Sequence, residues 1–506
     1  MQKGVYYTLN SVTFLRKKVN IQELIKRARE SGEDITSELR QKSITVPPWS
    51  QLVKAYDPNL HPVMDKTAYP DVVHYEERLS ETEVDEFGNP KVVKFPVGAP
   101  TKVTRITYDL QRLAVKRTTE LCFGIPVKRN YKPQNERQQE IAKYLEAIFQ
   151  RARIDSVNID RGRKLFASCE FVTIWYGVEQ KNNVYGFDSK LKLRCVTYSP
   201  MQGDDLYPLF DETGDLVALS IAYKRKVKER EESFFDTYTS EEHIRWSTED
   251  PTGGDNTKMK IVEDEKISTG KIPGIYVYRP TPAWEDGSPL VYEMEWAISR
   301  NGNYLRENSR PILMAAVSEE LKFGNSPATD AAFKDIVHYP QGSSLQYVTW
   351  NQAIENLKFY IYELRQMYFT QIQLPDWSYE NMKTSPMSGE ALKQLFIDCH
   401  LKVTDESGRL IEGFDREVNV VKSFLKLMLP NGYADDIDAL VVENEITPYT
   451  ISDEKDDVTL LLMKNGNKPL MSQRESIVAL GESEDPDKTL AEIQGENMAD
   501  AMEAAM

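Results

Sequence analysis

Cysteine and histidine, the residues that most often build metal and redox sites, are rare in this sequence. No two cysteines have C-x-x-C spacing, so neither a zinc site nor a disulfide scaffold is predicted; the four are Cys122, Cys169, Cys195 and Cys399. The five histidines are isolated from one another: His61, His74, His243, His338 and His400. Unpaired thiols are typical of a reducing cytoplasm. The sequence therefore predicts no metal and no cofactor.

Long apolar runs and an excess of positive charge are also absent. No stretch approaches the roughly 20 apolar residues that span a bilayer, so no membrane association is expected. Lysine and arginine total 63 against 79 aspartates and glutamates, which gives a formal net charge of −16. Because proteins that grip DNA neutralise its phosphates with cationic side chains, the chain as a whole would repel DNA. This excludes a DNA clamp but not a protein that DNA slides past.

Two short motifs are similar to catalytic ones without meeting their requirements. In STGKIPG, a P-loop would need a glycine five positions before Gly270, and Glu265 stands there. In QGDDLYP, Asp204 and Asp205 are adjacent and would face opposite ways on a strand, so this stretch is predicted to be a surface loop. An enzyme such as a carboxylate-metal hydrolase would need three or more carboxylates or histidines in one cleft, and their spacing does not favour that.

Residues 1–285 have the pattern of an α+β body. Helical periodicity covers 20–32, 105–124 and the region from 134, and the β-branched and aromatic stretch FVTIWYGV follows as a strand. VDEFGNPKVVKF indicates a hairpin, the Pro-rich stretch 45–63 is predicted to be irregular, and residues 183–280 are predicted to be rich in strands.

Two long helical patterns follow the body. The first has Ser288 as N-cap and Pro289 at N1, and Pro311 ends it. The second begins near Asn351 with apolar residues every three or four positions, and further aromatic residues widen its apolar surface: Phe359, Tyr360, Tyr362 and Phe369. A helix that is apolar on more than one side expects more than one neighbour. We expect the two helices to run antiparallel, with 313–349 as a small α/β unit between them.

An irregular stretch, LPDWSYENMKTSPM, separates these helices from the longest helical pattern in the chain. That pattern runs from Ser388 to Leu429. A bend is expected near Gly408 and Gly413, because each glycine costs about 1 kcal/mol inside a helix. A strand at 439–451 and an acidic, helical tail from Asp453 complete the chain.

The order of these elements, with the stretches FGIPVKRNY, NYLRENSRP and SPMSGEALKQLF, resembles the portal proteins of siphophage-type tailed bacteriophages. The resemblance covers most of the chain. It implies a portal-like α+β fold with a wing at 1–285, stem helix 1 at 286–312, a clip at 313–349 and stem helix 2 at 350–372. It further implies a tunnel loop at 373–387, a long wing-spanning helix with a strand at 388–452, and a helical crown at 453–506.

The same resemblance implies a non-enzymatic subunit of a dodecameric ring at one capsid vertex, located in the virion and, during assembly, in the host cytoplasm. Double-stranded DNA would pass through the ring during packaging and ejection. The implied partners are further copies of the chain, a terminase motor, head-tail adaptor proteins and the major capsid protein. The alternatives are the hydrolase considered above or another ring or adaptor protein of the virion.

In this family the tunnel loop faces the DNA channel, so the polar residues of the loop are the expected site: Asn381, Lys383, Thr384 and Ser385. Lys383 is the expected phosphate contact, because it is the only cation between Arg365 and Lys393. Trp377 is expected to anchor the loop against the long helices, since its indole would otherwise lie exposed in a wet channel.

This chain departs from the family pattern at two places. Cys169 and Glu170 stand near the start of the body strand, where relatives often carry glycine. The first 70 residues match no part of the family pattern, and their role stays open.

Overall fold

The computed structural model describes residues 21–73, 75–84, 90–211, 213–227, 230–248, 259–308, 312–316, 322–323, 337–338, 344–348, 354–376, 396–449, 454–466, 470–481, 483 and 485–504. Helices and antiparallel strands are mixed throughout these residues, which confirms the α+β class.

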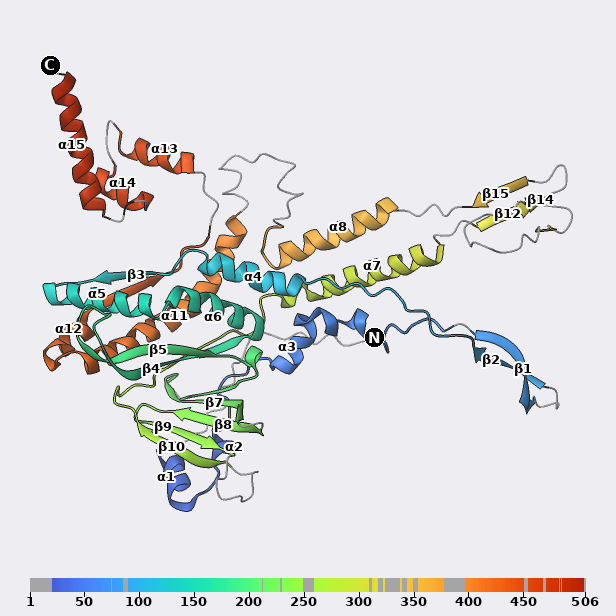
Figure 1. Ribbon diagram of the computed structural model, residues 1–506, viewed down its shortest axis with the longest axis horizontal. Helices are drawn as coiled ribbons and strands as arrows, with labels where there is room; N and C mark the ends of the chain where they lie inside the picture. Colours follow the sequence, from blue (N-terminus) through green and yellow to red (C-terminus); the bar gives the residue numbers. More distant parts are fainter. Residues whose placement is uncertain are drawn as a thin grey trace.

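A layer of helices packs on a three-stranded antiparallel sheet at the centre of the body (Figure 1). The sheet has the order β11-β4-β5, formed by β11 (Gly274–Tyr278), β4 (Glu170–Asn182) and β5 (Ser189–Tyr198). The helices are α4 (Leu110–Phe123), α5 (Glu136–Arg151) and α6 (Ile154–Ser168). Leu121, Phe166 and Trp175 are fully buried in the main apolar core. Helices α4, α5 and α6 and strand β4 confirm the helix-then-strand order predicted for 105–178, but the first helix begins at Leu110 and not at residue 105.

A second sheet of five antiparallel strands lies beside the first, in the order β10-β9-β8-β7-β6. Its strands are β6 (Asp205–Phe210), β7 (Leu216–Val227), β8 (Arg230–Tyr238), β9 (Glu242–Ser247) and β10 (Lys260–Lys266). Leu219 and Ile221 join it to the main core. On its other face, Phe235 and Trp246 pack in a separate apolar cluster with α1 (Ile21–Ser31) and α2 (Thr36–Leu39).

The long helix α11 (Ile397–Met428) crosses this body and is continuous over 32 residues. At Gly413 a Cβ atom would lie 2.7 Å from Cγ2 of Val277, so only glycine lets the helix approach β11 this closely. The two glycines therefore leave the helix continuous, and the bend expected near them stays a prediction. The packing of α11 against β11 offsets the loss of helix propensity at Gly413.

A buried ion pair fixes α11 to the helical layer. Both Nη atoms of Arg161 on α6 donate to the carboxylate of Glu417 on α11, at 2.5 and 3.1 Å. The indole Nε1–H of Trp175 on β4 donates to the same carboxylate at 2.8 Å. Arg161 also donates to Thr173 and Asn158. Each charged group is thus both paired and hydrogen-bonded, as burial of an ion pair requires.

Two long helices, α7 (Ser288–Asn308) and α8 (Ile354–Gln371), leave the body side by side (Figure 1). The chain runs outward along α7 and returns along α8. Short antiparallel pairs lie beyond their outer ends, β12 (Ile312–Ala316) with β15 (Ser344–Val348) and β13 (Lys322–Phe323) with β14 (Val337–His338). The hairpin of β1 (Tyr75–Val84) and β2 (Pro90–Pro96), predicted from sequence, also projects from the body.

The remaining elements border the body and end the chain. They are α3 (Trp49–Tyr56), β3 (Lys128–Lys132), α12 (Ala434–Ala439) and β16 (Val441–Glu445), with the short 3-10 turns η1 (Pro58–Leu60), η2 (Pro62–Met64), η3 (Pro200–Gln202), η4 (Glu285–Gly287) and η5 (Asn431–Tyr433). Strand β16 pairs with β3. The acidic tail forms α13 (Glu454–Lys464), α14 (Gln473–Leu480) and α15 (Pro486–Ala504), as its pattern predicts.

Two further sequence predictions are wrong. The Pro-rich stretch 45–63 is not irregular, because Pro48 precedes α3 as its N-cap instead of interrupting it, and Pro58 and Pro62 each open a 3-10 turn. The stretch at 202–208 is not a surface loop. Residues from Asp205 onward form β6, where Leu206 is fully buried and pairs with Ile221 of β7.

Cys169 occupies a backbone position that favours glycine. Its φ is +65°, in the left-handed region, and its N–H donates to the carbonyl of Leu165 at 2.9 Å to close the end of α6. Glycine would adopt this geometry without strain. The departure from the family pattern noted in the sequence therefore falls at the one-residue turn between α6 and β4, where the thiol is fully buried.

The ion pair of Glu417 generates a stability prediction. Replacing Glu417 by alanine should lower the free energy of unfolding by about 3–5 kcal/mol, because Arg161 would stay buried without its counter-ion. Urea unfolding measures the change. Glu412→Ala on the same helix is the control, since it removes only an exposed pair with Arg416 and should cost less than about 1 kcal/mol. Similar losses of unfolding free energy in the two variants would show that the buried ion pair of Glu417 stabilises the fold no more than the exposed pair does.

Candidate functional site

An extended strap, residues 104–108, lies along α7 and bonds to it at a regular interval. Every second backbone N–H of the strap donates to a side chain on every fourth residue of the helix. The pairs are Tyr108 to Glu295 at 2.8 Å, Ile106 to Ser299 at 2.9 Å, and Thr104 to Asn303 at 2.5 Å. Four helical residues rise about 6 Å and two extended residues about 6.6 Å, so the two repeats stay in register over the three pairs.

The strap can lie close to α7 only because residue 302 of the helix is glycine. A Cβ atom at Gly302 would lie 2.9 Å from Cγ2 of Thr104, so a side chain there would push the strap off the helix. The root of the β1–β2 hairpin is tied to the same place. Arg105 pairs with Asp71 at 2.9 Å, and the side-chain amide of Asn303 donates to the hydroxyl of Tyr69.

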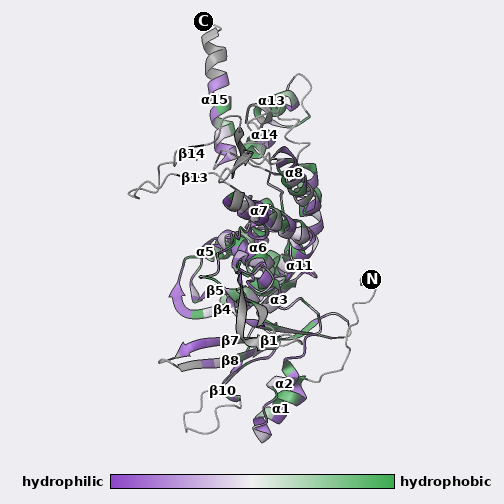
Figure 2. Ribbon diagram, turned by 90° about the vertical axis from the view of Figure 1, so that its right-hand side faces the viewer, coloured by the Kyte–Doolittle hydropathy of each residue, from purple (hydrophilic) through white to green (hydrophobic). Residues whose placement is uncertain are grey.

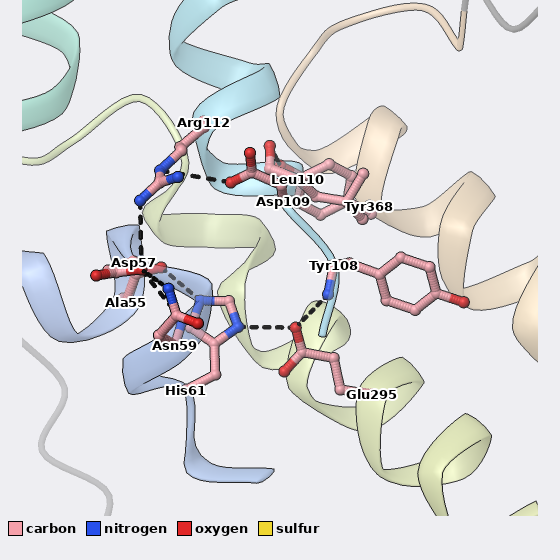
Figure 3. A network of polar contacts seen from close by, with 10 residues as sticks. All are labelled: Ala55, Asp57, Asn59, His61, Tyr108, Asp109, Leu110, Arg112, Glu295 and Tyr368. Carbon is pink, nitrogen blue, oxygen red and sulfur yellow. Dashed lines mark hydrogen bonds and ion pairs between the residues drawn. The ribbon is translucent and has the colours of Figure 1, made fainter. Parts of the chain in front are cut away.

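A buried histidine lies at the base of α7 (Figure 3). His61 follows η1, and both its side chain and that of Glu295 are fully buried. Nδ1 of His61 lies 2.7 Å from Oε1 of Glu295, and Nε2 lies 2.9 Å from the carbonyl oxygen of Ala55. A carboxylate and a carbonyl can only accept, so both ring nitrogens must donate. The geometry therefore fits an imidazolium paired with a carboxylate.

Electrostatics agree with this protonation state. Burial acts to lower the pKa of His61, but the hydrogen bond and charge of Glu295, with the carbonyl of Ala55, outweigh it and raise the pKa above its ordinary value. Glu295 thus serves two partners with one oxygen, the imidazole of His61 and the N–H of Tyr108. The N-terminal segment, the strap and α7 meet at this carboxylate.

Tyr368 joins α8 to the same base. Its hydroxyl donates to the carbonyl of Leu110 at 2.7 Å, at the start of α4 (Figure 3). Its ring fills the space beside Gly287, where a Cβ atom would lie 2.4 Å from Cε2 of Tyr368. Arg112 on α4 adds ion pairs with Asp57 and Asp109 at 3.3 and 3.5 Å. The Tyr368 contacts hold the inner end of α8 against the body, and the Arg112 pair with Asp57 joins α4 to the segment that carries His61.

The end of α8 is held at the entrance to the predicted tunnel loop. Gln373 has a φ of +54°, which ends the helix in the left-handed region. The ammonium of Lys402 on α11 donates to the carbonyl of Ile372, and burial lowers the pKa of Lys402 to about 8. Arg365 pairs with Asp376 at 2.8 Å. The chain is therefore fixed in place up to residue 376.

The expected site residues lie outside the described residues. These are Trp377, Asn381, Lys383, Thr384 and Ser385, and their assignment to a channel stays a prediction. Sequence reasoning missed His61, which it treated as isolated. It also missed the polar residues on α7, although Glu295, Ser299 and Asn303 recur every four positions and that spacing was a usable signal.

Several large apolar side chains are exposed on the outer side of α8, with the charged residue Glu363 among them. On the packed side of the helix, Leu364 and Tyr368 are buried. On the other side the exposed fractions are 65% for Phe359, 53% for Tyr362 and 52% for Met367. Large apolar side chains gathered on one exposed surface mark a contact with another polypeptide.

The described residues give no support to a metal site or a membrane span. No group of three or more His, Cys, Asp or Glu side chains among them could hold a metal ion. None of the helices in the described ranges is both long enough and apolar enough to cross a bilayer.

An α+β body that carries a projecting helix pair with an exposed apolar side defines a protein built to contact other polypeptides. The family model described as "Phage portal protein, SPP1 Gp6-like" matches residues 98–502, and the chain belongs to this family of phage portal proteins. The resemblance seen in the sequence is thereby confirmed. The chain therefore has the role of a portal or connector protein of a phage particle.

A solved structure described as "Neck of empty GTA particle computed with C6 symmetry" contains a similar chain. The two are 11% identical with a TM-score of 0.38, over 73% of this chain and 89% of that one. No curated protein matches the chain.

The His61–Glu295 pair generates a pH prediction. Because the folded-state pKa of His61 is raised, its stabilisation is complete below the unfolded-state value of about 6.5 and is lost as the pH rises through the folded-state pKa. The difference in unfolding free energy between the native chain and His61→Gln should therefore shrink as the pH rises from about 5.5 to 8.5. Denaturant unfolding of both proteins between about pH 5.5 and 8.5 measures this difference in free energy. A difference that grows with pH would show that His61 is neutral in the fold, and a constant difference would show that folding leaves its pKa unchanged.

Proposed function

We propose that the chain is the subunit of a closed dodecameric ring at one vertex of a tailed-phage capsid. Double-stranded DNA passes through the ring during packaging and ejection, and head-tail adaptors attach to it. The observation that carries the proposal, beside the family membership, is the exposed apolar side of α8. A second copy of the chain is its natural occupant, because head-to-tail contacts between identical subunits generate closed rings.

The expected division of the chain fits this proposal. The body at 1–285 with 388–452 serves as the wing, α7 and α8 as the stem helices, 313–349 as the clip and the C-terminal helices as the crown. The two short strand pairs beyond α7 and α8 support an outlying clip. A terminase motor supplies the energy for packaging, and the major capsid protein surrounds the wing. The chain itself needs no catalytic group for this role.

The rival hydrolase function lacks a supporting observation among the described residues. Asp204, the central residue of the candidate carboxylate motif, accepts a hydrogen bond from the N–H of Ser199 at 3.1 Å. It thereby closes the turn before β6 and has a structural role.

The ring itself can be tested at α8. Replacing both Phe359 and Tyr362 by glutamate should dissociate rings into smaller species, because the charges would be buried unpaired in the contact. Sedimentation velocity and negative-stain images measure the size. Lys358→Glu is the control, since it adds negative charge to the same exposed helix without removing apolar surface. Rings that survive the double substitution would place the subunit contact elsewhere, and a native chain that stays monomeric at high concentration would overturn the ring.

The channel loop can be tested at Lys383. Lys383→Glu should leave folding and ring assembly intact, since surface charge changes usually lie within about 0.5 kcal/mol. It should reduce packaging or retention of DNA, because each subunit would replace a phosphate-attracting charge by a repelling one. Capsids are assayed for DNA content, with Lys383→Arg as the charge-preserving control. Normal packaging and retention by Lys383→Glu would remove this residue from the site while leaving the ring proposal standing.

A further inference from the structure

A basic cavity opens at the outer edge of β5, away from the paired helices. It has a volume of about 620 Å³ and lies between β5, the β4–β5 turn and the break that separates α5 from α6. Four cationic side chains and two tyrosines line it, and no carboxylate does: Arg151, Arg153, Lys192, Arg194, Tyr176 and Tyr185. Figure 2 shows hydrophilic ends of the β4–β5 and β7–β8 hairpins projecting on one side of the body.

The four cations of this cavity have no carboxylate partner among the described residues. Elsewhere in these residues cations are commonly paired, for example Lys132 with Glu443 and Lys164 with Asp160. The chain has a formal net charge of −16, so acidic side chains are abundant. Four like charges around one cavity repel one another, and an anion between them would reverse the sign of that interaction.

The backbone at the cavity adds uncapped donors. Arg153 has a φ of +54° and is the N-cap residue of α6, but no side chain caps the helix. Among the described residues, the N–H groups of Asp155 and Ser156 have no hydrogen-bond acceptor. The 15-residue helix therefore begins beside the cavity with free N–H groups, which favour an anion.

Tyr185 supplies an independent indication of a ligand. Its side chain is buried with 2% exposed, and its hydroxyl oxygen accepts from the N–H of Leu193 at 2.9 Å. The hydroxyl hydrogen has no acceptor within the described part of the chain. The hydroxyl oxygen of Tyr185 already accepts one bond, so its hydrogen is available to an acceptor in the cavity.

We propose that this cavity binds a phosphate group, held by Arg151, Arg153, Lys192 and Arg194 and by the hydroxyl of Tyr185. A phosphate presents several charged oxygens in a tetrahedral arrangement, which suits donors that converge from different elements. A single carboxylate has two oxygens in one plane and would leave part of the donor set unused. The group comes either from the backbone of DNA or from free phosphate. The proposal stands apart from the ring, because it uses no residue of α7, α8 or the loop after α8.

The test compares two double variants of the full-length protein. Lys192→Gln with Arg194→Gln removes two cavity cations. Lys181→Gln with Lys190→Gln removes two exposed cations of the same hairpin that do not line the cavity, and is the matched control. Inorganic phosphate binding is measured by calorimetry, and binding of a short DNA duplex by fluorescence anisotropy over a range of salt concentrations. Sedimentation velocity reports the oligomeric state of each variant.

If free phosphate is the ligand, the cavity variant should bind it at least about tenfold more weakly than the native chain and the control. If DNA is the ligand, log affinity should fall less steeply with log salt concentration for the cavity variant alone. The slope should be smaller in magnitude by about 1.8, or 0.9 for each lost contact. Equal binding by both variants in both assays would overturn the proposal. A cavity variant that binds normally but changes its oligomeric state would also overturn it, by assigning the cavity to an acidic surface of another copy.

Discussion

The base of α7 depends on one constraint, which is that the repeat of the 104–108 strap must match the repeat of the helix. A helix and an extended chain have different repeats, and they match only where four helical residues meet two extended ones. Glu295, Ser299 and Asn303 use this match to satisfy three strap N–H groups that have no strand partner. The strap must then lie close to α7, which Gly302 permits. His61 reaches the site from a third segment, so the base closes only when all three segments have folded.

Sequence reasoning succeeded where the structure depends on neighbours along the chain. The helices of the body, α7, α8 and α11, and the β1–β2 hairpin follow from apolar spacing and from capping and turn residues, which are local properties. Order along the chain was sufficient to bring out the family resemblance. The loop residues from Trp377 to Ser385 came from that resemblance alone, and the described residues leave them untested.

The parts that could not be predicted are contacts between distant residues. Nothing near His61 in the sequence indicates Glu295, and nothing near Arg161 indicates Glu417, because 234 and 256 positions separate these partners. The prediction that 45–63 is irregular was wrong, because the effect of a proline depends on whether it precedes a helix or interrupts it. The sequence also did not show why Gly413 stands inside a long helix, which is its close approach to Val277. In each case tertiary packing decided what local preference left open.

The attachment of the strap also has a mechanical consequence. The root of the β1–β2 hairpin is clamped to α7 through Asp71, Arg105 and Asn303, and the strap leads directly from that root into α4. A tilt of α7 against the body would therefore carry the strap and the root of the hairpin with it, and would displace the point from which the hairpin projects.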